Sequence, residues 1–310
     1  MTEKGKTMIP EGKLAQVLVA EAAQPYPVPE NWCWTRIKYV AEVVTGRTPS
    51  GRKPVYFGGV APFFQQVDLA LGRHVNDAQE YLSERGKAVS RMIPAGSTAV
   101  CCAGGEVRCG YLEVAGATER QINTVIPKID PLYLYYYCCS ERFVSQLGPK
   151  ASSAAKRKIE DCMIPLPPMM EQRRIVACVE VFFTKMNQVK EELEDLIDSY
   201  EVRRAYVLQR ALAGEMTDFD GKGRGWSLGL NGVSSAPTQE DKRIAAVVEE
   251  RFVEGLQAKI LAETSILKID FTKKIILDQA FRGKLGTNDP SEEGGDKLLE
   301  KILVSTASTE

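Results

Sequence analysis

The chain has 310 residues, a net charge of −1 at pH 7 and 44% hydrophobic residues, values that are ordinary for a soluble protein. No apolar run reaches the length of a membrane span, and the first residues, MTEKGKTMIPEGK, lack the apolar core of a signal peptide. We therefore expect a cytoplasmic protein without a membrane segment.

The eight cysteines include no CxxC pair, and His74 is the only histidine, which argues against a zinc site or a disulfide framework. We interpret the cysteines as small buried hydrophobic residues in a reducing compartment. His74 has no evident nucleophile or metal-ligand set around it, so we expect a surface or structural role.

Charge is distributed unevenly along the chain. Residues 25–170 hold 17 Lys and Arg against 13 Asp and Glu, whereas the remainder holds 23 against 28. A basic body beside an acidic remainder is compatible with a polyanionic partner, although the signal is weak.

In chain order, residues 1–24 form an N-terminal arm in which the spacing of Leu14, Val17 and Leu18 predicts one or two helical turns. The segment PYPVPENWCW (Pro25–Trp34) then breaks the chain, because its three prolines prevent regular structure. A new domain, residues 25–170, starts there.

Within this domain, short apolar segments are separated by turns. We predict strands at Val60–Leu69, Ser97–Cys102, Val107–Ala115 and Asn123–Ile129, and a buried helix at Leu132–Leu147. The result is an α+β domain.

The most regular element follows at residues 171–216. Its apolar residues step by four and three, as in a coiled-coil seam, and a helix of this length extends about 65 Å. The seam consists of Ile175, Val179, Phe182, Met186, Val189, Leu193, Leu196 and Tyr200.

This helix is repeated. Shifted by 69 residues, Glu171–Met216 aligns without a gap on Glu240–Leu285, and the Gly- and Ser-rich residues 217–239 form the connection. We predict two long antiparallel coiled-coil-like helices, the second within residues 240–310. Near the end, KLLEKILV (Lys297–Val304) resembles KLAQVLVA (Lys13–Ala20).

Catalytic signatures are absent from the sequence. There is no GxxxxGK[ST], no GxGxxG after a strand, no HExxH and no Asn-Pro-Pro-aromatic motif. The amides and arginines of FFQQVD and TERQINT suit hydrogen bonds to base edges, but they suit the capping of strands equally well. The segment Arg142–Lys158 is a basic loop with five basic residues and no acidic one, and it suits either a phosphate backbone or solvent.

Several motifs together resemble the specificity subunit of type I restriction–modification enzymes. They are PYPVPENWCW, TGRTPS, the tyrosine-rich helix, IPLPPMMEQRRIV and LAGEM, with a second set within Ile276–Leu303. Members of this family usually carry two target-recognition domains and two long helices. One such domain is evident here, so the chain resembles a half-subunit.

The resemblance implies a non-catalytic reader of double-stranded DNA without a cofactor of its own. It would direct a methyltransferase subunit and a restriction/translocase subunit, which use S-adenosylmethionine, ATP and Mg²⁺, to a bipartite site. Two copies, joined through the long helices as a homodimer, would then recognise inverted half-sites.

We predict a DNA-binding surface built from four segments of the recognition domain, which are Thr45–Lys53, Gln65–Asp68, Arg120–Asn123 and Lys150–Lys158. The basic side chains would mainly hold phosphates, while Gln65, Gln66, Gln121 and Asn123 would read bases. The other predicted contacts are Arg47, Thr48, Ser50, Arg52, Lys53, Arg120, Lys150, Ser152, Ser153, Lys156, Arg157 and Lys158.

A competing interpretation remains open. A coiled-coil adaptor whose globular domain binds protein would explain the repeated helices equally well, but not the acid-free basic loop. A stand-alone nuclease is the weakest reading, since no convincing acidic metal-binding set is evident.

Overall fold

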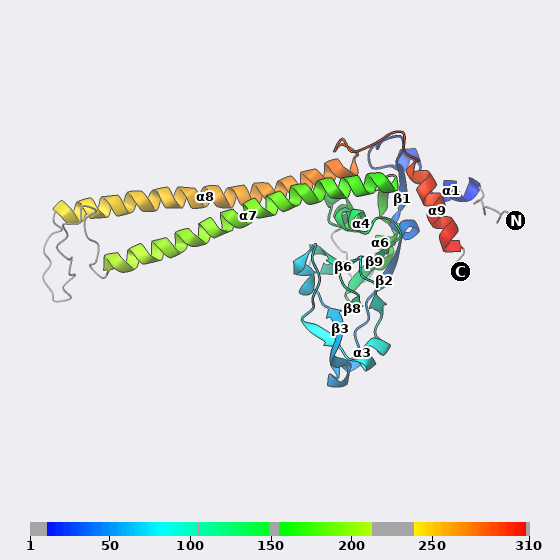
Figure 1. The fold of residues 1–310 in the computed structure, drawn as a ribbon, viewed down its shortest axis with the longest axis horizontal. Helices are drawn as coiled ribbons and strands as arrows, with labels where there is room; N and C mark the ends of the chain where they lie inside the picture. The colour runs from blue at the N-terminus through cyan, green and yellow to red at the C-terminus, as the bar shows by residue number, and fades with distance from the viewer. Residues whose placement is uncertain (1–10, 104–105, 149–154, 213–238, 308–310) are drawn as a thin grey trace. The chain divides into compact units, whose positions relative to one another are not determined.

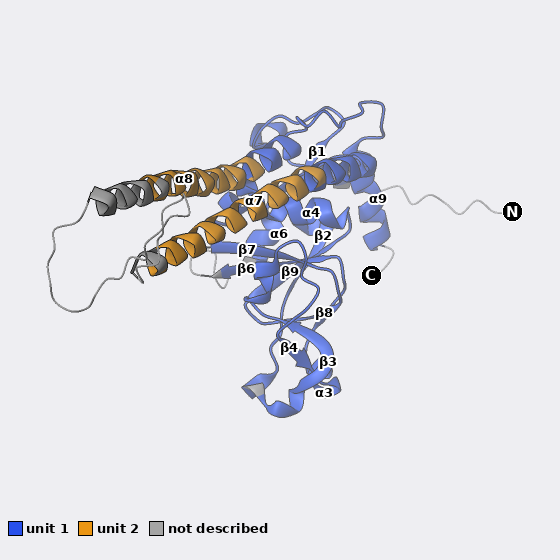
Figure 2. Ribbon diagram, turned by 60° about the vertical axis from the view of Figure 1, so that its left-hand side comes forward, with its two compact units in different colours: residues 1–180, 274–310 blue, residues 181–273 orange. Residues whose placement is uncertain are grey.

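A computed structural model describes residues 11–103, 106–148, 155–212 and 239–307. The chain divides into two compact units, residues 1–180 with 274–310 (unit 1) and residues 181–273 (unit 2), as Figure 2 shows. No helix among the described residues is both long enough and apolar enough to cross a membrane.

The core of unit 1 is a four-stranded antiparallel sheet in the order β2-β9-β6-β7. Its strands are β2 (Ala41–Thr45), β9 (Ile122–Pro127), β6 (Ser97–Ala103) and β7 (Glu106–Leu112). Valine, isoleucine and threonine dominate β9, as expected for a strand that is buried on both faces. Three of the four predicted strands correspond to β6, β7 and β9.

A second, mixed sheet has the order β4-β3-β8-β5, with β3 and β8 parallel. Its strands are β3 (Phe57–Phe64), β4 (Glu80–Leu82), β5 (Met92–Ile93) and β8 (Gly116–Thr118). The predicted strand Val60–Leu69 is wrong in its C-terminal half, because β3 ends at Phe64. The Asp68 carboxylate accepts hydrogen bonds from the backbone N–H groups of Gln65, at 2.7 Å, and Gln79, at 3.1 Å, which turns the chain after Phe64.

Short helical segments surround the sheets. They are α1 (Glu11–Val17), η1 (Glu21–Ala23), α2 (Ile37–Val40), η2 (Ser50–Arg52), η3 (Pro54–Tyr56), η4 (Asp68–Leu71), α3 (Glu84–Val89) and α6 (Ala155–Asp161). The beginning and the end of the recognition domain meet in a two-stranded antiparallel sheet, in which β1 (Cys33–Arg36) pairs with β10 (Met163–Leu166).

The predicted tyrosine-rich helix is two helices, α4 (Pro131–Cys138) and α5 (Glu141–Leu147). Ser140 separates them because its hydroxyl accepts a hydrogen bond from the N–H of Phe143 and caps the second helix. Asp130 caps α4 in the same way. The tyrosines are buried as predicted, with Tyr133 and Tyr137 fully inaccessible.

Helix α7 (Met169–Leu212) and helix α8 (Gln239–Phe281) confirm the two predicted long helices. Within unit 2, Lys190 pairs with Asp270, and Glu201 pairs with Lys259. A step forward along α7 therefore corresponds to an equal step backward along α8, which shows that the two helices are antiparallel. The predicted connection at 217–239 lies outside the described residues except for Gln239, which begins α8.

The C-terminal segment is part of unit 1, in which α9 (Gly295–Ala307) lies beside β1 (Figure 1). The Arg174 guanidinium bonds both carboxylate oxygens of Glu292 at 2.7 and 2.8 Å. At the end of α8, the Phe281 ring lies between those of Tyr133 and Tyr137, at 5.3 and 5.1 Å between centroids. The C-terminal tail is therefore packed against the domain of its own chain.

We expect Phe281→Ala to lower the free energy of unfolding by about 3–5 kcal/mol, because it leaves a cavity between two buried tyrosines. Met170, which is 54% exposed at the start of α7, supplies the control: Met170→Ala should change stability by less than about 0.5 kcal/mol. Urea unfolding of both variants measures the difference. Equal stabilities would contradict the packing of Phe281.

Candidate nucleic-acid interface

Three of the four predicted segments meet at one end of the four-stranded sheet. Beyond the last pair of β2 and β9, the N–H of Gly46 donates to the Ile122 carbonyl at 2.9 Å, and the N–H of Arg47 donates to the Thr118 carbonyl at 3.0 Å. The loop after β2 is thereby laid along the loop between β8 and β9.

Gly46 is required for this close approach. A Cβ atom at this position would lie 2.2 Å from the Glu119 carbonyl oxygen and 2.4 Å from that of Thr118. Only glycine allows the two backbones to come so near. The TGRTPS motif therefore places Arg47 and Thr48 at the edge of the second loop.

Glu119 joins the third segment to the other two. Its N–H donates to the Phe64 carbonyl at 3.0 Å, and its carboxylate accepts the N–H of Gln66 at 2.8 Å. On its other side, the N–H of Arg120 donates to the Thr48 hydroxyl at 3.1 Å. Residues far apart in the sequence, at 46–48, 64–66 and 118–121, thus form one surface.

The predicted side chains on this surface are accessible to different degrees. Arg47, Arg120 and Gln121 are exposed, and Thr48, Gln65 and Gln66 are half-buried. Ser50 and Lys53, further along the loop after β2, are exposed as well. The side chain of Arg52 lies outside what the structure describes, although its backbone belongs to η2. Two exposed cations and one exposed amide at one sheet end suit phosphate oxygens and base edges.

Asn123 is the exception among the predicted base readers. It is only 7% exposed, within β9, and its amide oxygen accepts a hydrogen bond from the Thr45 hydroxyl at 2.9 Å. This places Asn123 below the surface, where it bonds β9 to β2. We therefore leave it out of the candidate interface.

The fourth predicted segment is only partly described. Lys150, Ser152 and Ser153 lie outside the described residues, and Lys156, Arg157 and Lys158 lie on α6. Lys156 pairs with Glu160 at 3.6 Å, while the Lys158 ammonium donates to the Leu147 carbonyl at 3.0 Å. Lys158 therefore supports α5, and Arg157 remains exposed.

Cys102 lies at this end of the sheet, because its neighbour Cys101 in β6 pairs with Ile122 at the start of β9. Burial raises the pKa of the Cys102 thiol, and the positive charge of Lys158 on α6 partly opposes that rise.

Arg108 belongs to this region, and the sequence reasoning missed it. It lies opposite Cys101 in the pairing of β7 with β6, in the same row as Ile122, and its side chain is 48% exposed beside Glu106, at 3.1 Å. The alternation of charged and apolar residues in EVRC was the available signal, since it places both charged residues on the outer face.

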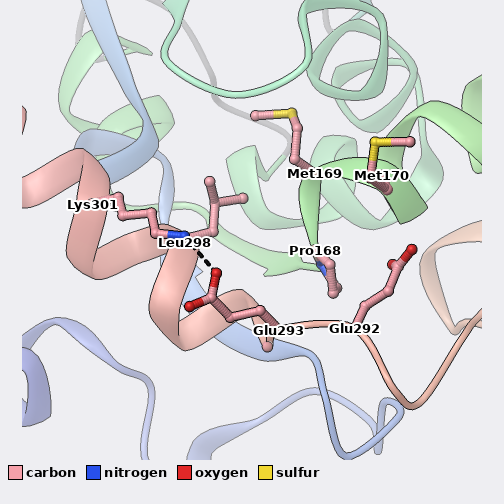
Figure 3. Close-up of a pocket in the computed structure, with 8 residues that line it drawn as sticks. Pro168, Met169, Met170, Glu292, Glu293, Leu298 and Lys301 are labelled. Carbon is pink, nitrogen blue, oxygen red and sulfur yellow. Dashed lines mark hydrogen bonds and ion pairs between the residues drawn. The ribbon is translucent and has the colours of Figure 1, made fainter.

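A cavity in unit 1 differs in chemistry from this surface. It has a volume of about 220 Å³ and lies at the start of α7, lined by Pro168, Met169, Met170, Glu292, Glu293, Gly294, Leu298 and Lys301 (Figure 3). Lys301 is paired with Glu293, so apolar and acidic groups dominate the walls. Such walls do not suit a polyanion.

Comparison with known proteins identifies the family. The model of the type I restriction modification DNA specificity domain matches residues 29–197, which is more than half of the chain. The chain belongs to this family. The resemblance inferred from the sequence motifs is thereby confirmed.

The relatives of this specificity-domain chain include named specificity subunits. That of the type I restriction enzyme MjaIX from Methanocaldococcus jannaschii is 25% identical over 54% of this chain and 42% of the relative. That of EcoAI from Escherichia coli is 22% identical over 93% of this chain and 46% of the relative. The chain spans less than half the length of these curated relatives.

Among solved structures, the HsdS subunit from Thermoanaerobacter tengcongensis is 19% identical, with a TM-score of 0.40, over 88% of this chain and 50% of that one.

The described residues were also searched for a metal-binding arrangement of side chains. Among the described residues, no group of three or more His, Cys, Asp and Glu side chains is arranged to hold a metal ion.

The contrast between two amide side chains tests the interface geometry. We expect Asn123→Ala to lower the free energy of unfolding by about 1–3 kcal/mol, because the Thr45 hydroxyl loses its partner inside the sheet. Gln121→Ala, at an exposed position, should stay within about 0.5 kcal/mol. Thermal and urea unfolding decide it, and an Asn123→Ala variant as stable as the parent would return Asn123 to the surface set.

Proposed function

We propose that this chain recognises DNA sequence as the specificity component of a type I restriction–modification system. The observation that carries the proposal is the convergence of three loops at one end of the four-stranded sheet. They bring Arg47, Arg120, Gln66 and Gln121 onto one surface of a family DNA specificity domain. An adaptor that binds only protein is not favoured by this family membership.

The side chains on this surface divide by chemistry. Arg47 and Arg120 carry full positive charge and would hold phosphates, and Arg108 and Arg157 are further candidates for such contacts. Gln65, Gln66 and Gln121 can donate and accept at once, as the edge of adenine requires, and one bidentate contact discriminates by about 1–3 kcal/mol.

The proposal assigns the chemistry of modification and cleavage to other subunits. A methyltransferase subunit would use S-adenosylmethionine, and a restriction/translocase subunit would use ATP and Mg²⁺. The names of the curated relatives, each a specificity subunit of a type I restriction enzyme, support this division. This chain would then bind DNA without a catalytic step of its own.

The proposal also includes a second copy of the chain, because every second apolar position of the seam on α7 is exposed in unit 2. Met186, Leu193 and Tyr200 are half-buried, and Gly255 of α8 lies against the Tyr200 ring. The seam positions between them are exposed to solvent: Phe182 is 43% exposed, Val189 48% and Leu196 45%. An apolar row at seven-residue spacing is a surface for another helix.

We expect Arg47→Ala combined with Arg120→Ala to weaken binding to all duplexes and to reduce the slope of log K against log salt by about 1.8, since each phosphate contact contributes about 0.9. Fluorescence anisotropy with a short labelled duplex of random sequence, over a salt series, measures both effects.

Arg203→Ala, at an exposed position on α7, is the matched control and should leave the slope unchanged. Lys156→Ala combined with Arg157→Ala tests α6 separately, and an unchanged slope would remove that helix from the interface. Binding of the parent chain that does not depend on salt would contradict the proposed function.

For the second copy, we expect Val189→Lys combined with Leu196→Lys to raise the dimer dissociation constant at least about 100-fold, because two apolar contacts are lost. Val181→Lys, at a 54% exposed position off the seam, should leave it unchanged. Sedimentation velocity at micromolar concentration decides it, and a parent chain that is monomeric with and without the methyltransferase subunit would exclude the dimer.

A further inference from the structure

The start of β3 carries an apolar projection, which we call the valine tip, formed by Val55 and Val60. Val55 is 44% exposed, and Val60, at 81%, is the most exposed of the large hydrophobic residues that the structure describes. Val55 lies in η3 and Val60 in β3 of the mixed sheet. Strand β3 and helix α3 lie at the end of unit 1 that is remote from β1 and α4 (Figures 1 and 2).

A β-bulge presents Val60 to solvent. Phe57 and Ala61 both lie opposite Leu82 of β4, so the three residues between them have no partners in the strand pairing. Gly58 has a φ of 80°, and a Cβ atom on Gly59 would lie 2.1 Å from the Leu82 carbonyl oxygen. The bulge thus depends on two glycines, one for its conformation and one for its close packing.

The backbone behind the valine tip is also fixed from the side of α3. The N–H of Ser83 donates to the Tyr56 carbonyl at 2.9 Å, and its hydroxyl donates to the Val55 carbonyl at 2.7 Å. A Cβ atom on Gly86 would lie 2.1 Å from the Tyr56 oxygen. Val60 therefore projects from a supported backbone.

Two exposed cations lie on the segments that adjoin the valine tip. Lys53 precedes Val55 by two residues and Arg85 lies on α3, whereas Lys87 of α3 is paired with Glu84 at 3.1 Å. A surface of two valines is far smaller than the area of about 800 Å² that a protein partner usually covers. A polyanion with small apolar groups fits both its charge and its size.

The valine tip lies within reach of the same duplex as the interface. Strand β3 leads from Val60 to Gln65, five residues that span about 16 Å, or about five base pairs. Strands β3 and β4 form an antiparallel ribbon at the edge of the mixed sheet, an element that the major groove admits. Valine is too short to wedge between stacked bases as longer side chains do.

We propose that Val60 is a specificity-determining residue that packs against a thymine methyl group in the major groove. The inference rests on the proposed function, because it requires that the chain reads duplex DNA. In the major groove, only thymine among the four bases presents a methyl group, so an apolar contact there distinguishes it. Lys53 and Arg85 hold the phosphates on either side.

Selection from a duplex pool with a randomised core tests the proposal. The parent chain is expected to select a sequence with a fixed thymine, and Val60→Ser to lose the preference at that position while keeping the others. In the duplex selected by the parent chain, replacing this thymine by deoxyuridine removes only the methyl group. It should weaken binding of the parent about fivefold and leave Val60→Ser unaffected.

Val144→Ser, at a 38% exposed position on α5, is the matched control and should select the parent sequence. Unchanged melting temperatures verify that both variants fold. Val60→Ser that selects the parent sequence, or that weakens binding to all sequences alike, would overturn the role of Val60 and leave the proposed function standing. A parent chain that selects no sequence would overturn the proposed function itself.

Discussion

The surface that we assign to DNA depends on one residue, Glu119. Its N–H reaches the end of β3, its carboxylate holds the N–H of Gln66, and its carbonyl oxygen lies where a side chain on Gly46 would have to be. Through these contacts, the end of β3 in the mixed sheet lies next to the loop after β2 in the four-stranded sheet. The loops of both sheets therefore form a single surface, and the position of each side chain on it depends on the others.

Rigidity of this kind is what sequence recognition requires. A base-reading amide discriminates only if its donor and acceptor are held at hydrogen-bond geometry when the base arrives, because ordering a mobile side chain consumes binding free energy. The backbone around Gln66 and Arg120 is fixed by hydrogen bonds of 2.8 and 3.1 Å. The exposed parts of the site are side chains, and their backbones are ordered beforehand.

The cis-docked C-terminal segment gives unit 1 a core that no local part of the sequence could form. Phe281, at the end of α8, lies between two tyrosines of α4, and Arg174 of α7 joins Glu292. Burial of an aromatic ring between two others stabilises the fold strongly. Unit 1 therefore includes the start of α7 and the end of α8.

By itself, the sequence determined the elements whose signal is local and periodic. The seven-residue spacing on α7 and its repeat on α8 required long helices, and the strands β6, β7 and β9 followed from their apolar segments. The family motifs and the cationic loops could also be recognised, because they depend only on residue composition and on the order of residues along the chain. Arg47 and Arg120 were predicted as DNA contacts in this way.

Only the tertiary structure decided which polar groups are buried and which surfaces adjoin. Asn123 and Gln121 have similar chemistry and lie two residues apart, yet strand pairing buries the first beside Thr45 and leaves the second in solvent. Ser140 divides a continuous apolar run, and a bulge turns Val60 outward. The physical reason is that burial is set by contacts between distant segments, whereas periodicity records only how each segment faces its neighbours.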